Sequence, residues 1–147
     1  MFKHLLIPVD GTDLAERAMQ AGIDLARQLD ASITAFIAEP PAPGPNPGRN
    51  ALAYPREVEQ HNQATAEHAQ AVLGNFERRA AAAGVPFTGV HSQAYRIDEE
   101  IADTARERGC DMIVMVTHGR GIFGELLFGS RTKGVMALSK VPLLVLH

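Results

Sequence analysis

The stretch DMIVMVTHGRGIFGELLFGSRTK, residues 111–133, joins an apolar run to a glycine-rich segment and then to a helical sequence. Residues 111–116 form the continuous apolar run that is typical of an interior strand in a parallel sheet covered on both faces. Four glycines follow, at positions 119, 121, 124 and 129. Glycines permit positive φ angles and close backbone approach, and the free N–H groups at a helix start favour an anion. The stretch therefore predicts a phosphate site.

Two known phosphate-binding motifs nearly match this segment. The spacing Gly119-x-Gly121-x-x-Gly124 fits a dinucleotide fingerprint, but that fingerprint needs an immediate helix and an acidic residue about 20 positions later. No Asp or Glu follows Glu125. A P-loop alignment that ends on Gly129 puts Ser130 in the place of the phosphate-binding lysine. The sequence therefore argues against a P-loop hydrolase.

A third pattern fits better, namely Thr117-His118-Gly119, nine further residues, and then Gly129-Ser130. This pattern resembles the universal stress protein family, whose nucleotide-binding members carry Gly-x-x-Gly-x9-Gly-Ser/Thr at this place. The resemblance extends over essentially the whole chain, from LLIPVDGT at residues 5–12 to VPLLVLH at residues 141–147. One position departs from the pattern, because Val116 stands where the family has its first glycine.

The resemblance implies a site for ATP or AMP, with or without Mg²⁺. Carried over by position, the implied nucleotide contacts are Pro8, Val9, Asp10, Ala38, Val116, His118, Gly119, Gly129, Ser130, Arg131 and Thr132. Asp10 suits a ribose hydroxyl or an adenine amine, and its alternative role is to cap the first helix. His118 and Ser130 can donate to a phosphate. Two positions weaken the pattern, because Ala38 is small for a wall against adenine and Val116 adds bulk beside the ligand.

Composition places the chain among ordinary globular proteins. The 147 residues, 46% hydrophobic and 21% charged, predict a single universal stress protein-like domain over residues 1–147. The net charge of −3 gives no electrostatic case for nucleic acid. No apolar run reaches the ~18 residues of a membrane span. The single cysteine, Cys110, agrees with a reducing compartment. We interpret its side chain as a small buried hydrophobe. We therefore expect a cytoplasmic protein that binds neither nucleic acid nor membrane.

The remaining chain alternates between strand and helix patterns. The expected strands are 5–9, 33–38, 85–93, 111–116 and 142–146, and the expected helices are 13–29, 56–83, 97–109 and 130–139. Asp13 and Glu16 are interpreted as a capping box for the first helix. Residues 39–55 hold six of the nine prolines and form a loop, which is either a lid over a ligand or a disordered insertion.

Alternation of this kind predicts an α/β fold of the doubly wound, Rossmann-like type. We expect a five-stranded parallel sheet in the order 3-2-1-4-5 with helices on both faces. In this order the ligand lies outside the carboxyl ends of the first and fourth strands, so Pro8–Asp10 would face Val116–Gly119. His61, His68 and His91 have no second ligand at metal-binding spacing and are interpreted as solvated or helix-face residues.

Three functional hypotheses remain open. The first is a non-catalytic nucleotide sensor in which occupancy orders the loops at 39–55 and 120–128 for a downstream protein partner. The second is a stress-response interaction protein of the same fold that binds no nucleotide. The third is a slow ATPase, for which the chain offers no evident general base, P-loop lysine or paired carboxylates near the glycines. In each case the uncharged apolar segment 141–146 predicts a homodimer through the last strand.

Overall fold

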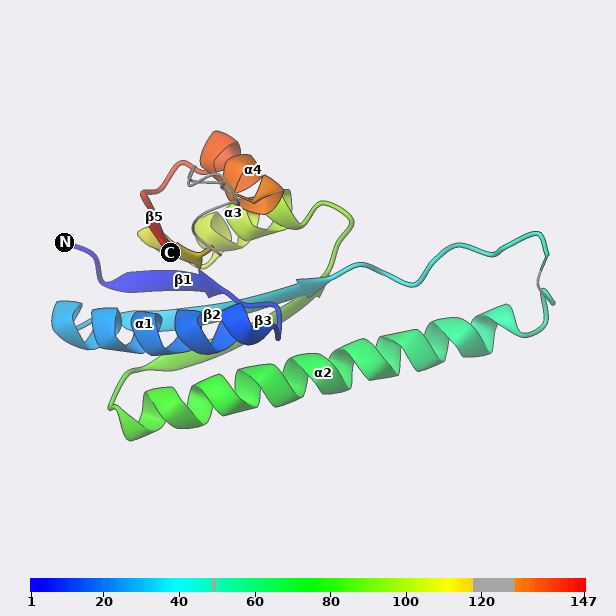
Figure 1. The fold of residues 1–147 in the computed structure, drawn as a ribbon, viewed down its shortest axis with the longest axis horizontal. Helices are drawn as coiled ribbons and strands as arrows, with labels where there is room; N and C mark the ends of the chain where they lie inside the picture. Colours follow the sequence, from blue (N-terminus) through cyan, green and yellow to red (C-terminus); the bar gives the residue numbers. More distant parts are fainter. Residues whose placement is uncertain (49, 118–128) are drawn as a thin grey trace.

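The computed structural model describes residues 1–48, 50–117 and 129–147, within which strands and helices alternate (Figure 1). The elements are β1 (His4–Pro8), α1 (Asp13–Leu29), β2 (Ser32–Glu39), α2 (Tyr54–Ala82), β3 (Phe87–Gln93), α3 (Ile97–Glu107), β4 (Met112–Val116), α4 (Ser130–Leu138) and β5 (Leu143–Leu146). The five strands pair in parallel in the order β3-β2-β1-β4-β5. The predicted fold class and strand order are confirmed.

Helices cover both faces of the sheet. Successive side chains of a strand point to opposite faces, so an apolar strand needs apolar partners on each face. Leu5 and Ile7 of β1 pack in one core cluster with residues of α1 and α2, whereas Leu6 packs in a second cluster with residues of α3 and α4. Cys110 belongs to the second cluster and is buried, as expected, and this burial raises the pKa of its thiol. The chain therefore forms three layers, with α1 and α2 on one side and α3 and α4 on the other (Figure 1).

Helix α1 lies very close to β1 because its buried face is built from small residues. A Cβ atom placed on Gly22 would lie only 2.2 Å from Cδ1 of Ile7, so any side chain at this position would require Ile7 or the helix to move. Ala15, Ala18 and Ala26 are also buried on this side of the helix. Leu25 and Leu29 of the same helix are only half buried.

The predicted capping box at the start of α1 is wrong. The N-cap residue is Thr12, and its side chain makes no capping hydrogen bond. Glu16 instead pairs with Arg79 and accepts a hydrogen bond from Asn75 Nδ2 at 3.2 Å, so α2 holds this carboxylate. The capping-box pattern depends only on local spacing, whereas the observed partner is 63 residues away in sequence.

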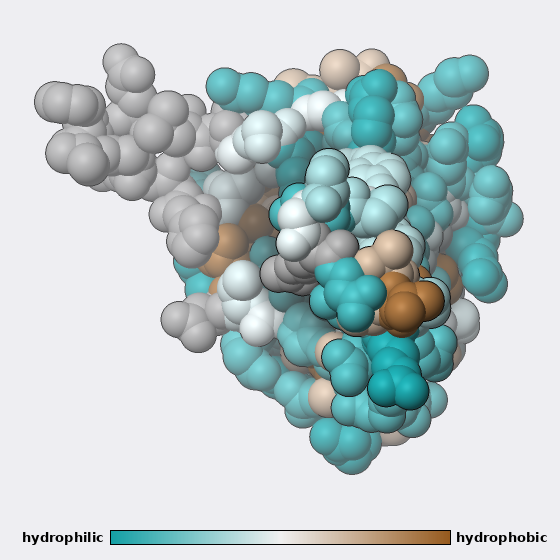
Figure 2. All heavy atoms as spheres, turned by 90° about the vertical axis from the view of Figure 1, so that its right-hand side faces the viewer, coloured by the Kyte–Doolittle hydropathy of each residue, from teal (hydrophilic) through white to brown (hydrophobic). Residues whose placement is uncertain are grey.

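Helix α2 extends beyond the sheet at its N-terminal end, beside the proline-rich segment (Figure 1). Its buried residues, Ala69, Phe76 and Ala80, all lie in its second half. The molecular surface at the projecting end is largely hydrophilic (Figure 2), although the Leu52 side chain is 86% exposed. In the described part of the chain, no helix is both long and apolar enough to span a bilayer.

Candidate functional site

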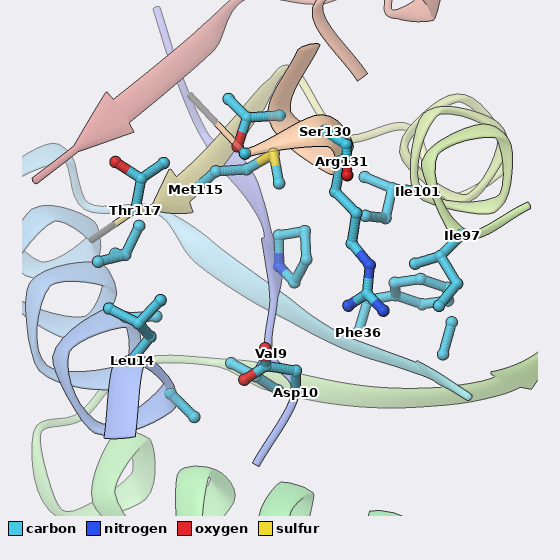
Figure 3. A pocket seen from close by; sticks show the side chains of 17 residues that line it. Val9, Asp10, Leu14, Phe36, Ile97, Ile101, Met115, Thr117, Ser130 and Arg131 are labelled. Carbon is cyan, nitrogen blue, oxygen red and sulfur yellow. The ribbon is translucent and has the colours of Figure 1, made fainter. Parts of the chain in front are cut away.

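A pocket of about 350 Å³ opens at the carboxyl ends of the central strands, between α1 on one side and α3 and α4 on the other (Figure 3). It is lined by Pro8, Val9 and Asp10 at the end of β1, Phe36 and Ala38 of β2, Met115, Val116 and Thr117 at the end of β4, Leu14, Ala15 and Ala18 of α1, Ile97 and Ile101 of α3, and Gly129, Ser130, Arg131 and Thr132 at the start of α4. The winding of the sheet reverses between β1 and β4, which is where such folds hold ligands.

The pocket brings together nine of the eleven residues that the sequence singled out. They are Pro8, Val9, Asp10, Ala38, Val116, Gly129, Ser130, Arg131 and Thr132. The other two, His118 and Gly119, lie outside the described residues, as does the loop at 120–128. Of the proline-rich segment, neither residues 40–48 nor residues 50–53 line this pocket, so the structure gives the lid hypothesis no support.

The start of α4 makes one side of the pocket suitable for an anion. The helix begins at Ser130 after Gly129, and its first turn contains no acidic residue. Free N–H groups and the helix dipole both favour negative charge at such a position. The Arg131 side chain extends from this helix start toward the side of the pocket that holds Phe36 (Figure 3). A positive side chain and a helix N-terminus therefore share the pocket.

Asp10 places a carboxylate on the opposite side of the pocket from Ser130 (Figure 3). Its Oδ1 atom accepts hydrogen bonds from Thr12 N at 3.0 Å and from Thr12 Oγ1 at 2.6 Å. These bonds fix the turn before α1, so the proposed capping role is replaced by support of the N-cap residue. The Oδ2 atom accepts no hydrogen bond from the described part of the chain, and it can therefore accept one from a ligand.

Sequence reasoning missed the apolar wall of the pocket. Phe36, Ile97, Ile101 and Met115 line it, and Ile101 is 2% exposed. Ile97 and Ile101 lie one turn apart on α3, which was recognised as a helix without any indication of which neighbour its apolar face would cover. The four-residue spacing of Ile97 and Ile101 was the available signal in the sequence, because it places both side chains on one face of the helix. The wall gives the pocket one apolar side and one polar side.

Val116, the departure from the family pattern, is half buried and packs against the core cluster on the α1 side of the sheet. It pairs with Leu146 of β5, and the next residue, Thr117, donates its backbone N–H to Leu146 O at 2.8 Å. Apolar neighbours therefore support the valine side chain at the edge of the pocket.

His61 and His68 lie on α2, as expected, and the structure adds a polar neighbour for each of the three histidines. His68 Nδ1 lies 2.7 Å from Glu39 Oε1, and His91 Nε2 lies 3.4 Å from Glu39 Oε2. His61 Nε2 lies 3.0 Å from the backbone oxygen of Pro40. Spacing along the chain could not show that three elements converge on Glu39. Within residues 1–48, 50–117 and 129–147, no group of three or more His, Cys, Asp or Glu residues could hold a metal ion.

The strand order, the layers and the pocket at the switch point together define a doubly wound α/β domain. The model of the universal stress protein family matches residues 1–147. The chain therefore belongs to the universal stress protein family.

Individual relatives agree with this assignment. A universal stress protein from Thermus aquaticus is 30% identical over 147 residues, covering all of both chains. Among solved structures, the universal stress protein UspA from Lactobacillus plantarum has a TM-score of 0.80 at 22% identity, covering 99% of this chain and 98% of that one. A universal stress protein solved in complex with cAMP has a TM-score of 0.67 at 23% identity, covering 99% and 97%.

Proposed function

We propose that this protein binds an adenine nucleotide, ATP or AMP, in the pocket between β1 and β4 and acts as a non-catalytic sensor or regulator in a stress response. The observation that carries the proposal is the opposition of the α4 start, Gly129 to Thr132, to Asp10 across one pocket. The helix start suits a phosphate, and Asp10 Oδ2, which accepts no hydrogen bond from a described residue, suits a hydroxyl or amine donor.

The dimensions and lining of the pocket agree with this ligand. A volume of about 350 Å³ lies in the range of roughly 300–1,000 Å³ that small-molecule sites occupy. A purine is flat and largely apolar, so it suits the wall formed by Phe36, Ile97 and Ile101. The relative solved with cAMP supports the choice of adenine.

The described lining contains few groups that could catalyse phosphate transfer. Asp10 is its one carboxylate, and Thr12 already bonds one oxygen of that group. A water nucleophile needs a residue that orients it, and the described lining offers no lysine or histidine. If Mg²⁺ accompanies ATP, Asp10 is the described lining residue that could contact it. We place the protein in the cytoplasm, where nucleotide concentration would be the sensed quantity.

Dimerisation through β5 belongs to the same proposal. The strand lies at the sheet edge, and all four of its residues, Leu143 to Leu146, remain partly exposed. The neighbouring α4 exposes Met136 and Leu138 by 53% and 42%. An uncharged apolar edge of this kind favours antiparallel pairing with a second copy.

One observation favours the alternative of an interaction protein that binds no nucleotide. Val116 puts a branched side chain at the edge of the pocket, where glycine would leave backbone accessible to a ligand. In that case the protein would act by binding a partner protein through its outer surface, and the pocket would have no ligand.

Mass spectrometry of the denatured protein, purified without added ligand, tests the proposal. We expect an adenine nucleotide in near-equimolar amount, or else a rise in melting temperature with millimolar ATP or AMP. Ligand at about 100 times its Kd stabilises the native state by about 2.7 kcal/mol. Absence of both a bound nucleotide and a thermal shift would refute the proposal and favour the interaction protein.

A further inference from the structure

We propose that His68 of α2 is a positioning residue that holds the turn at Asp10–Gly11 in its ligand-binding conformation, an inference that rests on the proposed function. The Asp10–Gly11 turn is the stretch that leaves β1, lines the pocket and leads into α1. Helix α2 does not line the pocket within the described residues, so His68 acts on the site through the turn.

The first observation is that the His68 ring is fixed by Glu39. Glu39 is the last residue of β2 and follows Ala38, a lining residue of the pocket. Since a carboxylate only accepts, the His68 Nδ1–H donates to Glu39 Oε1 across 2.7 Å. The Glu39 side chain is only 18% exposed, and its Oε2 atom is buried 3.4 Å from His91 Nε2 on β3. One imidazole is therefore hydrogen-bonded to this carboxylate, and a second lies beside its Oε2 atom, which has no hydrogen-bond partner among the described residues.

The second observation is that the far side of the ring lies against Gly11. A Cβ atom placed on Gly11 would lie 2.4 Å from Nε2 and 2.8 Å from Cε1 of His68. Gly11 also has a φ of 76°, a conformation that glycine adopts without strain. The turn needs glycine both for its backbone angle and for the approach of the ring.

These contacts form a continuous chain from α2 to the ligand side of the pocket. Glu39 orients the ring, the ring packs against Gly11, and the adjacent Asp10 presents its carboxylate to the pocket while holding Thr12. A binding site keeps its geometry only if neighbouring groups restrain it to about 0.5 Å. The His68 side chain is 44% exposed, so removal of the ring would let water in beside Gly11, and the turn could then shift away from the ligand.

A purely structural role for His68 makes a different prediction. Loss of a structural contact would lower the melting temperature and leave the affinity of the folded protein unchanged. His61 provides a matched control, because it lies on the same helix and contacts Pro40 O at 3.0 Å without lining the pocket.

The test combines calorimetric titration of ATP and AMP with amide hydrogen exchange in the absence of ligand. Relative to the parent, we expect His68→Ala to weaken binding about five- to tenfold, a size typical of mutations that act on a site through intervening contacts. His68→Gln retains an amide donor for Glu39 and should recover part of the loss. His61→Ala should bind as the parent does.

The rate of amide hydrogen exchange reports on the conformation of the turn directly, and its measurement needs no ligand. The Thr12 amide, bonded to Asp10 Oδ1 at 3.0 Å, should exchange faster in His68→Ala than in His61→Ala. Unchanged Thr12 exchange in His68→Ala would overturn the inference, as would parental affinity with only a lower melting temperature. A parent protein that binds neither nucleotide, with faster Thr12 exchange in His68→Ala, would refute the proposed function and retain the positioning of the turn.

Discussion

Replacing Gly129 and Ser130 together with valine is expected to abolish nucleotide binding and to leave the fold intact. Gly129 has φ −57° and ψ 157°, which valine adopts readily. A Cβ atom at this position would meet no described atom within 4 Å, so it clashes with none of the described residues. The valine side chain would lie beside the start of α4, where the phosphate is expected to bind. The second substitution removes the Ser130 hydroxyl donor.

The two effects differ in size. A hydrogen bond from a hydroxyl to a charged phosphate contributes about 1.5–3 kcal/mol, which corresponds to roughly a 10- to 150-fold loss of affinity. The bulk at Gly129 adds to this loss by keeping phosphate away from the backbone N–H groups. Valine at the cap and in the first turn of α4 should cost the fold only about 1 kcal/mol. For a chain of this length that cost lowers the melting temperature by about 2–4 °C.

Calorimetric titration of ATP and AMP measures the affinity, and circular dichroism measures the melting temperature. Gly44→Val is the matched control, because its Cβ atom also meets nothing within 4 Å and Gly44 does not line this pocket. It should bind as the parent does. A folded double variant that binds ATP within about threefold of the parent would refute a phosphate site at the start of α4.

Four further outcomes are expected. Val116→Gly should tighten ATP binding in titration if the valine obstructs the ligand, and equal or weaker affinity would show that it is tolerated. Light scattering at micromolar concentration should give a dimer for the parent and a monomer for Val145→Pro, because the register of β5 on β4 turns the Val145 N–H toward the free edge and proline removes that donor. A parent that runs as a monomer contradicts the proposed interface. Purified protein should release negligible phosphate from ATP, and turnover that disappears in Asp10→Ala would restore the enzyme hypothesis. Phe76→Ala should lower the free energy of unfolding by about 3–5 kcal/mol in urea titration, because Phe76 is fully buried and contacts Phe87 with ring centroids 5.1 Å apart.

The sequence predicts most of the architecture because periodicity reports burial directly. The apolar run at 111–116 and the alternation of strands with helices were enough to predict the parallel sheet and its order. That order was enough to place Pro8 to Asp10 in one pocket with Val116 and Thr117. These inferences need only local patterns and the handedness of βαβ units.

Contacts between distant segments were not predictable in the same way. Glu16 matched a local capping pattern but pairs with Arg79 of α2, and Glu39 meets His68 and His91 from two other elements. Such pairings depend on the position of each helix along the sheet. The spacing of apolar residues in the sequence does not determine that position. The apolar wall from α3 was missed for the same reason.

The close approach of α1 to β1 has a consequence for how this pocket can diversify. Ala15 and Ala18 line the pocket, whereas Gly22, further along the same helix, only keeps the helix against Ile7. A larger residue at position 22 would have to displace either the Ile7 side chain or the helix, and a displaced helix would move Ala15 and Ala18 outward. Related chains can therefore change the width of the crevice, and with it the size of the preferred ligand, through a position that no ligand touches.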